Sequence, residues 1–346
     1  MNKNNSENTA LLVGDLHLRR DYLEFGKILL LFVLETIKAK KPKYTIFMGD
    51  QFHFKDRISG ICVKVYNDFL IEASKHTKII ILVGNHDWCQ PYTIHSMESF
   101  KNIPNVKVVD DFFRLDNDNL FISYCREKER FNDLLKQAGP CKRLFGHLDI
   151  NSFKVGSGWE EVEAFCDPDF FSDQQIKEVY SGHLHLAQEQ TVKGTRITFV
   201  GTGYTTDFGE TDQSKRLILL NLDDSSYESI DTGLTFHKTL KINAGDQFPE
   251  VPVEEMEKGI EYRLIIKGTK EQISMIQKPK NYYIKKIVYD WVLNEGARMD
   301  LSVIDSKDTI MKKYIEQEIK RSFNDDPSFN KEELFKIGNR ILNSVK

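Results

Sequence analysis

The sequence has few cysteines, no long hydrophobic run and no excess of positive charge. Its five cysteines, among 346 residues, form no C-x-x-C pair, which predicts buried free thiols in a reducing compartment. The longest apolar run covers 28–34, and roughly 20 residues are needed to cross a bilayer. The first ten residues lack the apolar core of a signal peptide. We therefore expect a soluble cytoplasmic protein without membrane contact, in the host cytoplasm if the source is viral.

The charge balance excludes a basic surface over the whole molecule. The net charge is −4 and the pI is near 6.2, so a polyanion would have to be held by a local patch or by bound cations. Hydrophobic content of 40% and aromatic content of 11% indicate a globular protein. A chain of 346 residues exceeds one ordinary core, which predicts two or three domains.

Short apolar runs that end in glycine and polar residues recur through the first two thirds of the chain. They begin at Ala10, Tyr44, Ile79, Arg143, Val179 and Ile197, and a similar run begins at Arg216. Such runs are typical of strands buried on both faces. Helical patterns lie between them, at 22–39, 61–75 and 172–178. The apolar face of the first helix is expected to comprise Leu30, Leu31, Leu34 and Ile37. This alternation predicts a layered α/β fold.

The character of the sequence changes after about residue 236. Strand-like segments at 261–268 and 282–291 flank a short helical segment, which predicts a small α+β domain. The last 40 residues hold two amphipathic helical patterns. We therefore expect three domains, at 1–235, 236–305 and 306–346. The terminal helices either pack on their own domain or bind a partner.

Residues that can bind metal follow the predicted strands, each after a glycine-containing turn. The clusters are Asp15 with His17; Asp50 with His53; Asn85, His86 and Asp87; His147; and His183 with His185. Taken singly, a strand-end aspartate usually caps a helix and a lone histidine is usually a satisfied core or surface residue. In open α/β sheets, sites form at the carboxyl ends of strands, where all these clusters fall. Their coincidence predicts one joint site.

The residue types indicate which chemistry this site would support. Carboxylate, amide and imidazole ligands favour Mn²⁺, Fe²⁺ or Zn²⁺. Six or seven such ligands are too many for one ion with an open position. They suit two ions about 3.5–4 Å apart that share a carboxylate, the arrangement for in-line displacement at phosphorus. Two cations would lower the pKa of a water nucleophile and neutralise charge on the phosphate.

The motifs D-x-H, GD-xx-H, GNHD, GH and GH-x-H, in this order, resemble the calcineurin-like metallophosphoesterase superfamily over about residues 10–223. The resemblance implies a four-layer β-sandwich flanked by helices. It also implies two metal ions. One would be held by Asp15, His17, Asp50 and His185. The second would be held by Asn85, His147 and His183, with Asp50 bridging the two.

The resemblance implies a catalytic rather than a ligand role for His86. It would stabilise charge on the phosphate and protonate the leaving oxygen, which suits an imidazole near neutral pH. The alternative is that His86 only orients Asp15 or a backbone carbonyl. Asp87 is expected to brace the turn rather than to contact a metal.

Two departures separate the sequence from the protein phosphatases of the superfamily, which carry GD-xx-DRG and GNHE. Here Lys55 stands at the position of the phosphate-gripping arginine, and His53 replaces the aspartate that partners the catalytic histidine. GD-x-FH with GNHD is instead similar to DNA-repair nucleases of the SbcD type and to the nuclease subunit of phage recombination endonucleases. In that family His53 would be a catalytic auxiliary that helps to admit double-stranded ends.

Later segments are similar to the same nucleases. Residues 199–210 resemble the pattern Y-x-G-[ST]-P-Y…E, with Gly203 in place of the usual proline and with Glu210 kept. The region around 240–300 lies where the family has its DNA-capping domain. The terminal helices lie where the family binds the coiled-coil base of an SbcC-type ABC ATPase.

The resemblance therefore implies a DNA nuclease, most simply with Mn²⁺, that acts in double-strand-break processing and recombination. It would be an exonuclease on duplex ends and an endonuclease on single strands. The expected partners are DNA, an SbcC-type ATPase and a second copy of the chain, with the dimer surface on helices at 61–75 and 92–101. One alternative is a small-molecule phosphodiesterase or phosphatase of the same fold. The other is a non-catalytic scaffold.

Overall fold

The computed structural model describes residues 8–155, 159–160, 164, 166–247, 259–276 and 284–291. Residues Met1–Asp290 form one compact unit, to which nearly all the described residues belong. The predicted helical segment 306–346 lies outside the described residues. The domain boundaries at 235 and 305 therefore stay predictions.

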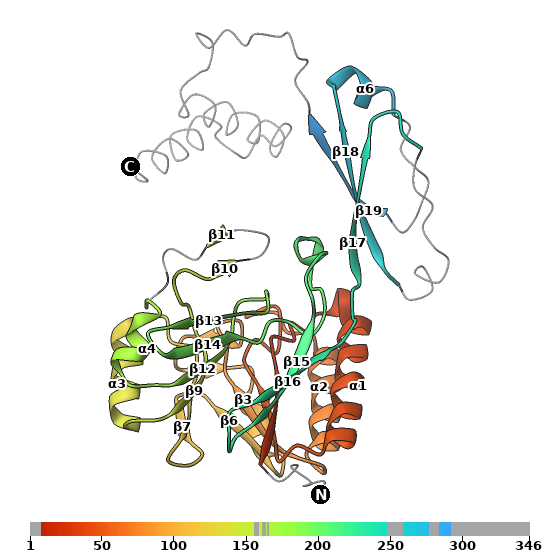
Figure 1. Ribbon diagram of the computed structural model, residues 1–346. Coiled ribbons are helices and arrows are strands. Elements are labelled where there is room, and N and C mark those ends of the chain that lie inside the picture. Colours follow the sequence, from red (N-terminus) through yellow and green to blue (C-terminus); the bar gives the residue numbers. More distant parts are fainter. Residues whose placement is uncertain are drawn as a thin grey trace, which may run out of the picture. The chain divides into compact units, whose positions relative to one another are not determined.

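Two six-stranded sheets form the centre of this unit (Figure 1). The first has the order β16-β15-β1-β2-β3-β6. Its strands are β1 (Thr9–Val13), β2 (Tyr44–Phe47), β3 (Lys78–Leu82), β6 (Val106–Val109), β15 (Arg216–Asn221) and β16 (Tyr227–Asp231). The strands β1, β2, β3 and β6 are parallel, and β15 pairs antiparallel with both β1 and β16.

The second sheet repeats this plan, with the order β13-β14-β12-β9-β8-β7. Its strands are β7 (Phe112–Arg114), β8 (Asn119–Ile122), β9 (Arg143–His147), β12 (Glu178–Gly182), β13 (Gln188–Val192) and β14 (Thr195–Phe199). The four central strands are parallel, and β7 and β13 are antiparallel edges. The apolar runs that begin at Ala10, Tyr44, Ile79, Arg143, Val179 and Ile197 thus form parallel strands, whereas the run from Arg216 is the antiparallel β15.

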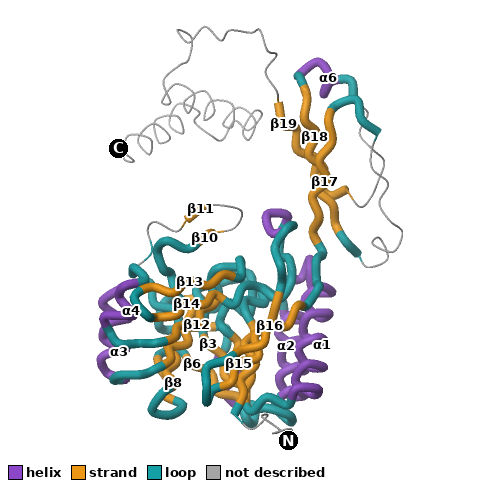
Figure 2. The backbone as a smooth tube through the Cα atoms, in the orientation of Figure 1, coloured by secondary structure: helices purple, strands orange, loops and turns teal. Residues whose placement is uncertain are grey.

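Helices cover the outer face of each sheet (Figure 2). The first sheet packs against α1 (Leu23–Lys40) and α2 (Gly60–Ala73), and the second against α3 (Lys128–Ala138) and α4 (Asp169–Asp173). A third cluster of buried apolar side chains lies between the two sheets. The order helix, sheet, sheet, helix confirms the predicted four-layer α/β fold.

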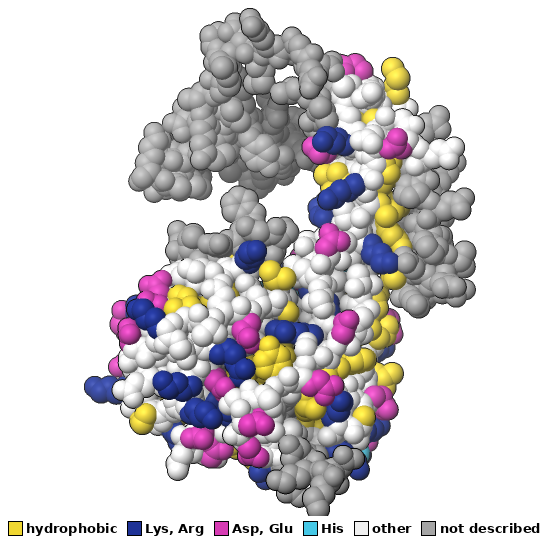
Figure 3. All heavy atoms as spheres, viewed as in Figure 1, with side chains coloured by type: hydrophobic (Ala, Val, Ile, Leu, Met, Phe, Trp, Pro, Cys, Tyr) yellow, Lys and Arg dark blue, Asp and Glu magenta, His cyan; other side chains and the backbone are white. Residues whose placement is uncertain are grey.

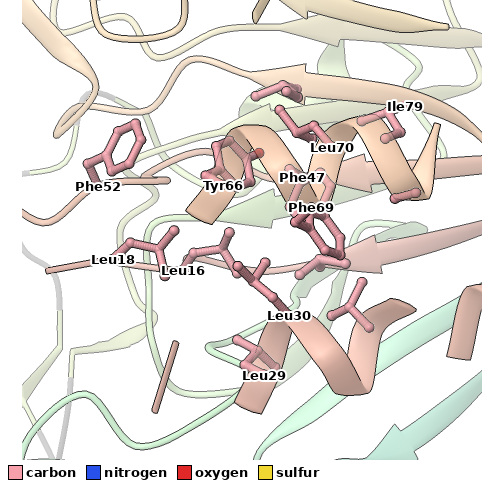
Figure 4. Close-up of a cluster of buried hydrophobic side chains, with 14 of the residues drawn as sticks. Leu16, Leu18, Leu29, Leu30, Phe47, Phe52, Tyr66, Phe69, Leu70 and Ile79 are labelled. Carbon is pink, nitrogen blue, oxygen red and sulfur yellow. The ribbon is translucent and has the colours of Figure 1, made fainter. Parts of the chain in front are cut away.

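The alternation along β1 shows how the layers are built. Leu11 and Val13 face the helices, whereas Ala10 and Leu12 face the second sheet, because successive side chains of a strand point to opposite faces. Figure 4 shows the helix-side cluster. The side chains labelled there include Leu29 and Leu30 of α1, Tyr66, Phe69 and Leu70 of α2, and Phe47 of β2.

Among the helices predicted for the described residues, those at 22–39 and 61–75 and the short one between 268 and 282 are correct, and those at 172–178 and 92–101 are wrong. The bounds at 22–39 and 61–75 match α1 and α2, although the buried face of α1 was partly wrong, since Leu31 is 60% exposed. The pattern at 172–178 is wrong because α4 ends at Asp173 and β12 begins at Glu178. The segment 92–101 is not an α-helix either. It holds β5 (Ile94–His95), paired with β4 (Trp88–Gln90), and most of the 3₁₀ turn η2 (Glu98–Asn102).

A third, three-stranded sheet follows the sandwich. It has the order β17-β18-β19, with β17 (His237–Asn243), β18 (Glu261–Gly268), β19 (Ile284–Trp291) and the short helix α6 (Lys270–Ser274). Both strand-like segments of the sequence are strands here. Contacts join this sheet to the sandwich: the Tyr22 hydroxyl donates to Glu261, 3.0 Å away, and the Phe25 ring stacks on Phe236 with centroids 4.2 Å apart.

Shorter elements complete the described chain. They are η1 (Arg20–Tyr22), η3 (Phe208–Glu210), β10 (Lys154–Val155) and β11 (Trp159–Glu160). All five cysteines are free thiols. Four are buried as expected, but Cys89 is exposed, because it lies on a loop-side strand outside the sandwich core. Among the described residues, no helix is both long and apolar enough to cross a membrane.

Candidate metal centre

The parallel strands of both sheets bring their carboxyl ends to one place, and the predicted site residues follow those ends. Asp15 and His17 follow β1, Asp50 and His53 follow β2, and Asn85 and His86 follow β3. His147 ends β9, and His183 and His185 follow β12. The contacts below show that the fold brings together every residue that the sequence analysis assigned to the site.

One cluster of ligand atoms comes from Asp15, His17 and His185, which lie within 4.8 Å of one another. The Nε2 atoms of His17 and His185 are 2.9 Å apart. Nδ1 of His185 lies 2.6 Å from the Glu210 carboxylate, which can only accept, so Nδ1 carries the proton. When the ring of His185 is neutral, its Nε2 therefore has no proton, and its lone pair is free for a metal ion or for the nearby Nε2 of His17.

A second cluster is formed by Asn85, His147 and His183. His147 Nδ1 donates to the carbonyl of Met48 at 2.8 Å, and His183 Nε2 contacts the carboxylate of Asp149 at 2.5 Å. These partners fix the tautomers. When the rings are neutral, His147 Nε2 and His183 Nδ1 therefore carry no proton, and each has a free lone pair. The two nitrogens lie 3.3 Å apart, and they are 2.8 Å and 3.1 Å from Oδ1 of Asn85.

The donor set of both clusters fits a bound cation. Three acceptor atoms that face one another in the second cluster repel unless positive charge lies between them. Bonds of about 2.1 Å to a central ion put neighbouring ligands about 3 Å apart, as found here. The first cluster has the same short nitrogen–nitrogen separation. Oxygen and imidazole ligands without thiolate suit Mn²⁺, Fe²⁺ or Zn²⁺.

Asp50 lies between the two clusters. Its Oδ1 is 3.4 Å from Nε2 of His147, and its Oδ2 is 3.7 Å from Nε2 of His17. The backbone N–H of His86 donates to the same Oδ1 at 2.8 Å and fixes the carboxylate. Each cluster therefore faces a different oxygen of one buried carboxylate.

The charges of these groups also call for a cation. Burial raises the pKa of Asp15, because ionisation without water is costly. Burial would raise the pKa of Asp50 too, yet His147 and His17 hold it well below its usual range. Burial would lower the pKa of His147, but the Asp50 and Asp15 carboxylates raise it to about 10. Without metal, a proton on His147 supplies the positive charge that an ion would otherwise bring.

The two histidines predicted to be catalytic lie at the edge of the clusters. Nδ1 of His86 donates to the carbonyl of His53 at 2.6 Å, and its ring lies edge to face with His17, with centroids 4.9 Å apart. Nε2 of His53 accepts from Arg19 at 3.4 Å. Burial and the Arg19 charge lower the pKa of His53 to about 4, so that His53 is neutral at neutral pH.

Asp87 braces the turn, as predicted. Its Oδ1 accepts from the backbone N–H groups of Gln51 and Phe52 at 3.0 Å and 3.4 Å, and its Oδ2 accepts from Gly84 at 3.0 Å. The side chain is fully buried. It ties the turn after β3 to the turn after β2, and so holds Asn85 in register with Asp50.

The backbone is tightly constrained under the site. His17, Asp50 and His183 have φ values of 44°, 54° and 81°. Residues other than glycine rarely adopt this left-handed backbone region. A methyl group at Gly14 would lie 1.7 Å from the carbonyl oxygen of Gly201. Only glycine allows these two strand ends to approach so closely. The backbone is therefore locally strained where it brings the ligand side chains together.

Three functional residues escaped the sequence analysis. Asp149 contacts His183, Glu210 contacts His185, and Arg19 contacts His53. Asp149 and Arg19 each stand two residues after a site histidine, which was the available signal. Glu210 was noticed within the 199–210 pattern, but without a role.

A further group of possible ligands, His95, Glu98 and Asp110, is satisfied within the protein. Nδ1 of His95 accepts from the backbone of Met97, so Nε2 carries the proton and donates to the carboxylates. Lys101 lies 2.9 Å from Glu98 and 2.8 Å from Asp110 and forms an ion pair with each. With no free lone pair on the ring, this group is a structural ion-pair network.

Comparison with known proteins identifies the family. The model of the calcineurin-like phosphoesterase family matches residues 9–187. An archaeal phosphodiesterase of known structure is similar at 14% identity and a TM-score of 0.37, covering 64% of this chain and 99% of its own. GAP50, the anchor in the inner membrane complex of Plasmodium, is similar at 12% identity and a TM-score of 0.39, covering 65% and 88%. No curated protein matches. The family match spans more than half of the sequence, and the chain therefore belongs to the calcineurin-like phosphoesterases, a family of metal-dependent hydrolases.

Proposed function

We propose that the protein is a two-metal DNA nuclease. One ion would be held by Asp15, His17, Asp50 and His185. The other would be held by Asn85, His147 and His183, with Asp50 shared. The observation that carries the proposal is the pair of ligand clusters with one buried carboxylate between them. Mn²⁺ suits these oxygen and nitrogen donors. Two such ions supply a nucleophile from water at neutral pH and offset the phosphate's negative charge.

His86 would protonate the leaving oxygen. Its Nδ1 is held by the carbonyl of His53, so Nε2 is the atom left to carry the transferred proton. His53 would contact the substrate as a neutral hydrogen-bonding group, since its pKa of about 4 keeps it uncharged. The fixed guanidinium of Arg19 lies beside it.

Three features favour DNA over a small phosphoester. A hollow of about 570 Å³ is lined by His53 and His86 and continues over the loop 54–57, which carries Lys55 and Arg57. The β17–β19 sheet adds a further surface, which a small substrate does not need. The GD-x-FH motif also separates the chain from protein phosphatases. A non-catalytic scaffold is disfavoured because no predicted ligand has been lost.

The test uses the purified full-length protein with Mn²⁺. It is offered linear duplex DNA, a single-stranded circle and a chromogenic phosphodiester. We expect cleavage of both DNAs, and a His86→Ala variant that keeps its bound metal but loses most of this activity. Turnover of the chromogenic ester with both DNAs intact, even with the ATPase partner present, would instead favour the small-molecule phosphodiesterase.

We also propose a homodimer that works with an SbcC-type ABC ATPase in the cytoplasm. Ile61 and Ile71 of α2 and Ile94 are exposed apolar side chains in the two segments expected at the dimer surface. Light scattering with size-exclusion chromatography should show a dimer that an Ile61→Glu, Ile71→Glu variant abolishes. Co-purification with the ATPase should require residues 306–346. A monomeric wild-type protein would contradict the first expectation.

A further inference from the structure

The hollow beside the two histidines has one wall that the metal centre does not use. Its lining comprises His53, Phe54, Lys55, Asp56, Arg57 and His86. The loop is anchored at two carbonyls: His86 donates to that of His53 at 2.6 Å, and the Cys89 thiol donates to that of Lys55 at 3.1 Å. Phe54 lies between these anchors. The wall is therefore built before any ligand arrives.

Phe54 is the unusual member of this wall. Its side chain is 49% exposed, although large aromatic side chains normally bury most of their area. The ring lies roughly perpendicular to that of His53, with centroids 4.7 Å apart, and about half of the residue stays exposed. A half-exposed aromatic ring next to a phosphoesterase centre suits contact with a planar group, such as a nucleic-acid base.

Arg19 supplies a fixed positive charge on the other side of His53. It donates to His53 and, at 2.9 Å, to the carbonyl of Thr206, and it lies 4.1 Å above the centre of the Tyr22 ring. No carboxylate in the described part of the chain forms an ion pair with it. An arginine held in place by neutral partners keeps its charge available for an anion, and phosphate matches its planar fork.

We propose that Arg19 and the 54–57 loop form a nucleotide subsite next to the scissile phosphate. A base stacks on Phe54, Arg19 binds the adjoining backbone phosphate, and Lys55 and Arg57 add positive charge. This inference rests on the proposed function, because it takes the substrate to be a nucleic-acid strand. These contacts would bind the strand in addition to its contacts with the metal ions.

The size and charge of the hollow fit this occupant. A volume of about 570 Å³ falls within the range of ordinary ligand pockets. Lys55 and Arg57 outnumber Asp56 on its wall, and Arg19 lies beside His53, which belongs to that wall. On the face drawn in Figure 3, Lys and Arg are interspersed with Asp and Glu, so a broad basic surface does not hold DNA there. A small basic subsite would let a protein of negative net charge bind a polyanion.

The test measures how each variant responds to loss of one base. Wild-type protein with Mn²⁺ is given a single-stranded oligonucleotide and matched oligonucleotides with one abasic position on either side of the cleaved bond. Stacking of one base changes kcat/KM by about 5-fold or more, so one abasic oligonucleotide should be cut at least that much more slowly. Phe54→Ala should remove this difference, and Phe54→Tyr should restore it.

Arg19 is tested by salt dependence. Arg19→Gln should raise KM and reduce the slope of log affinity against log salt by about 0.7, the contribution of one phosphate on a single strand. Leu31→Ala, at an exposed apolar position of α1, and Arg20→Gln, at the neighbouring exposed arginine, are matched controls that should leave both readouts unchanged.

The outcomes separate the inference from the proposed function. Full abasic sensitivity in Phe54→Ala, or an unchanged salt slope in Arg19→Gln, with DNA still cleaved, would overturn the subsite alone. Wild-type protein that cuts none of the oligonucleotides but hydrolyses a chromogenic phosphodiester would overturn the nuclease proposal, and the subsite with it.

Discussion

The two ligand clusters face each other across Asp50, but the groups behind them differ. Behind His185 stands Glu210, which is buried and neutralised by the buried ammonium of Lys215 at 2.7 Å. Behind His183 stands Asp149, whose side chain is 21% exposed and whose other contact is a 3.4 Å hydrogen bond from Tyr124. One histidine is fixed by a closed charge network, and the other by a single carboxylate near water.

This difference predicts that the two clusters bind their metal ions with different affinities. A ligand held from behind in a fixed orientation binds metal more tightly, and it gives the metal up more slowly. We therefore expect the ion at Asp15, His17 and His185 to be the more tightly bound. The ion at Asn85, His147 and His183 should exchange more readily, since its supporting carboxylate is open to solvent.

The largest expected effect is on folding, from Glu210→Gln. The change leaves Lys215 buried without its counter-charge, which should lower the free energy of unfolding by about 3–5 kcal/mol. Urea denaturation in the presence of a chelator measures it. A double variant that also carries Lys215→Met should recover part of the loss, because no unpaired charge then remains. An effect below about 1 kcal/mol would show that the pair is not the closed network described, since such a value is typical of exposed pairs.

Metal addition should stabilise the wild-type protein. At a free Mn²⁺ concentration 100 times the dissociation constant, each bound ion adds about 2.7 kcal/mol, since ligand binding favours the folded state. Denaturation midpoints measured with Mn²⁺ and with chelator give this difference. Asp50→Asn should reduce it most, because both clusters lose their common carboxylate. A midpoint that Mn²⁺ leaves unchanged would contradict the metal centre itself.

Asp149→Asn should act on one ion only. Loss of a carboxylate behind a ligating histidine costs about 10- to 100-fold in metal affinity, and here the weaker of two calorimetric binding events should change. The free energy of unfolding should change by less than about 1 kcal/mol, because the side chain is partly exposed and has no buried counter-charge. If both binding events weaken equally, the two clusters are not independent.

The smallest effect is on pH dependence without metal. Burial would raise the pKa of Glu210, but His185 and Lys215 hold it well below its usual range. A depressed carboxyl pKa stabilises the fold above the unfolded value of about 4.3, and this stabilisation is lost as the pH falls toward the folded pKa. Denaturation between pH 6 and 3 should show that loss. Glu210→Gln should flatten it, and Asp149→Asn should do so less.

The sequence could predict that these residues meet, because each follows a buried strand after a glycine turn, and strand ends in an α/β fold converge. Their roles as metal ligands stay predictions. It predicted the supporting groups poorly. Glu210 lies 25 residues from His185, and Arg19 lies 34 residues before His53, so only the fold reveals those contacts. The segment 92–101 misled for another reason. It forms a short hairpin strand and a 3₁₀ turn, both too short to be told from a helix in the sequence.

The facing lone pairs have a consequence for the life of this protein in a cell. A newly made chain that has not met a metal ion must hold these ligand atoms together with a proton on His147 in place of the ion, and it must keep three left-handed residues at the meeting point of its two sheets. An ion that replaces this proton would bind all the ligands at once, and so it would contribute to folding as well as to chemistry. We therefore expect that, when divalent cations are scarce, the unfolded fraction of the chain rises and proteases remove it. The cellular supply of metal would then set how much of this hydrolase exists, before it sets how fast each molecule works.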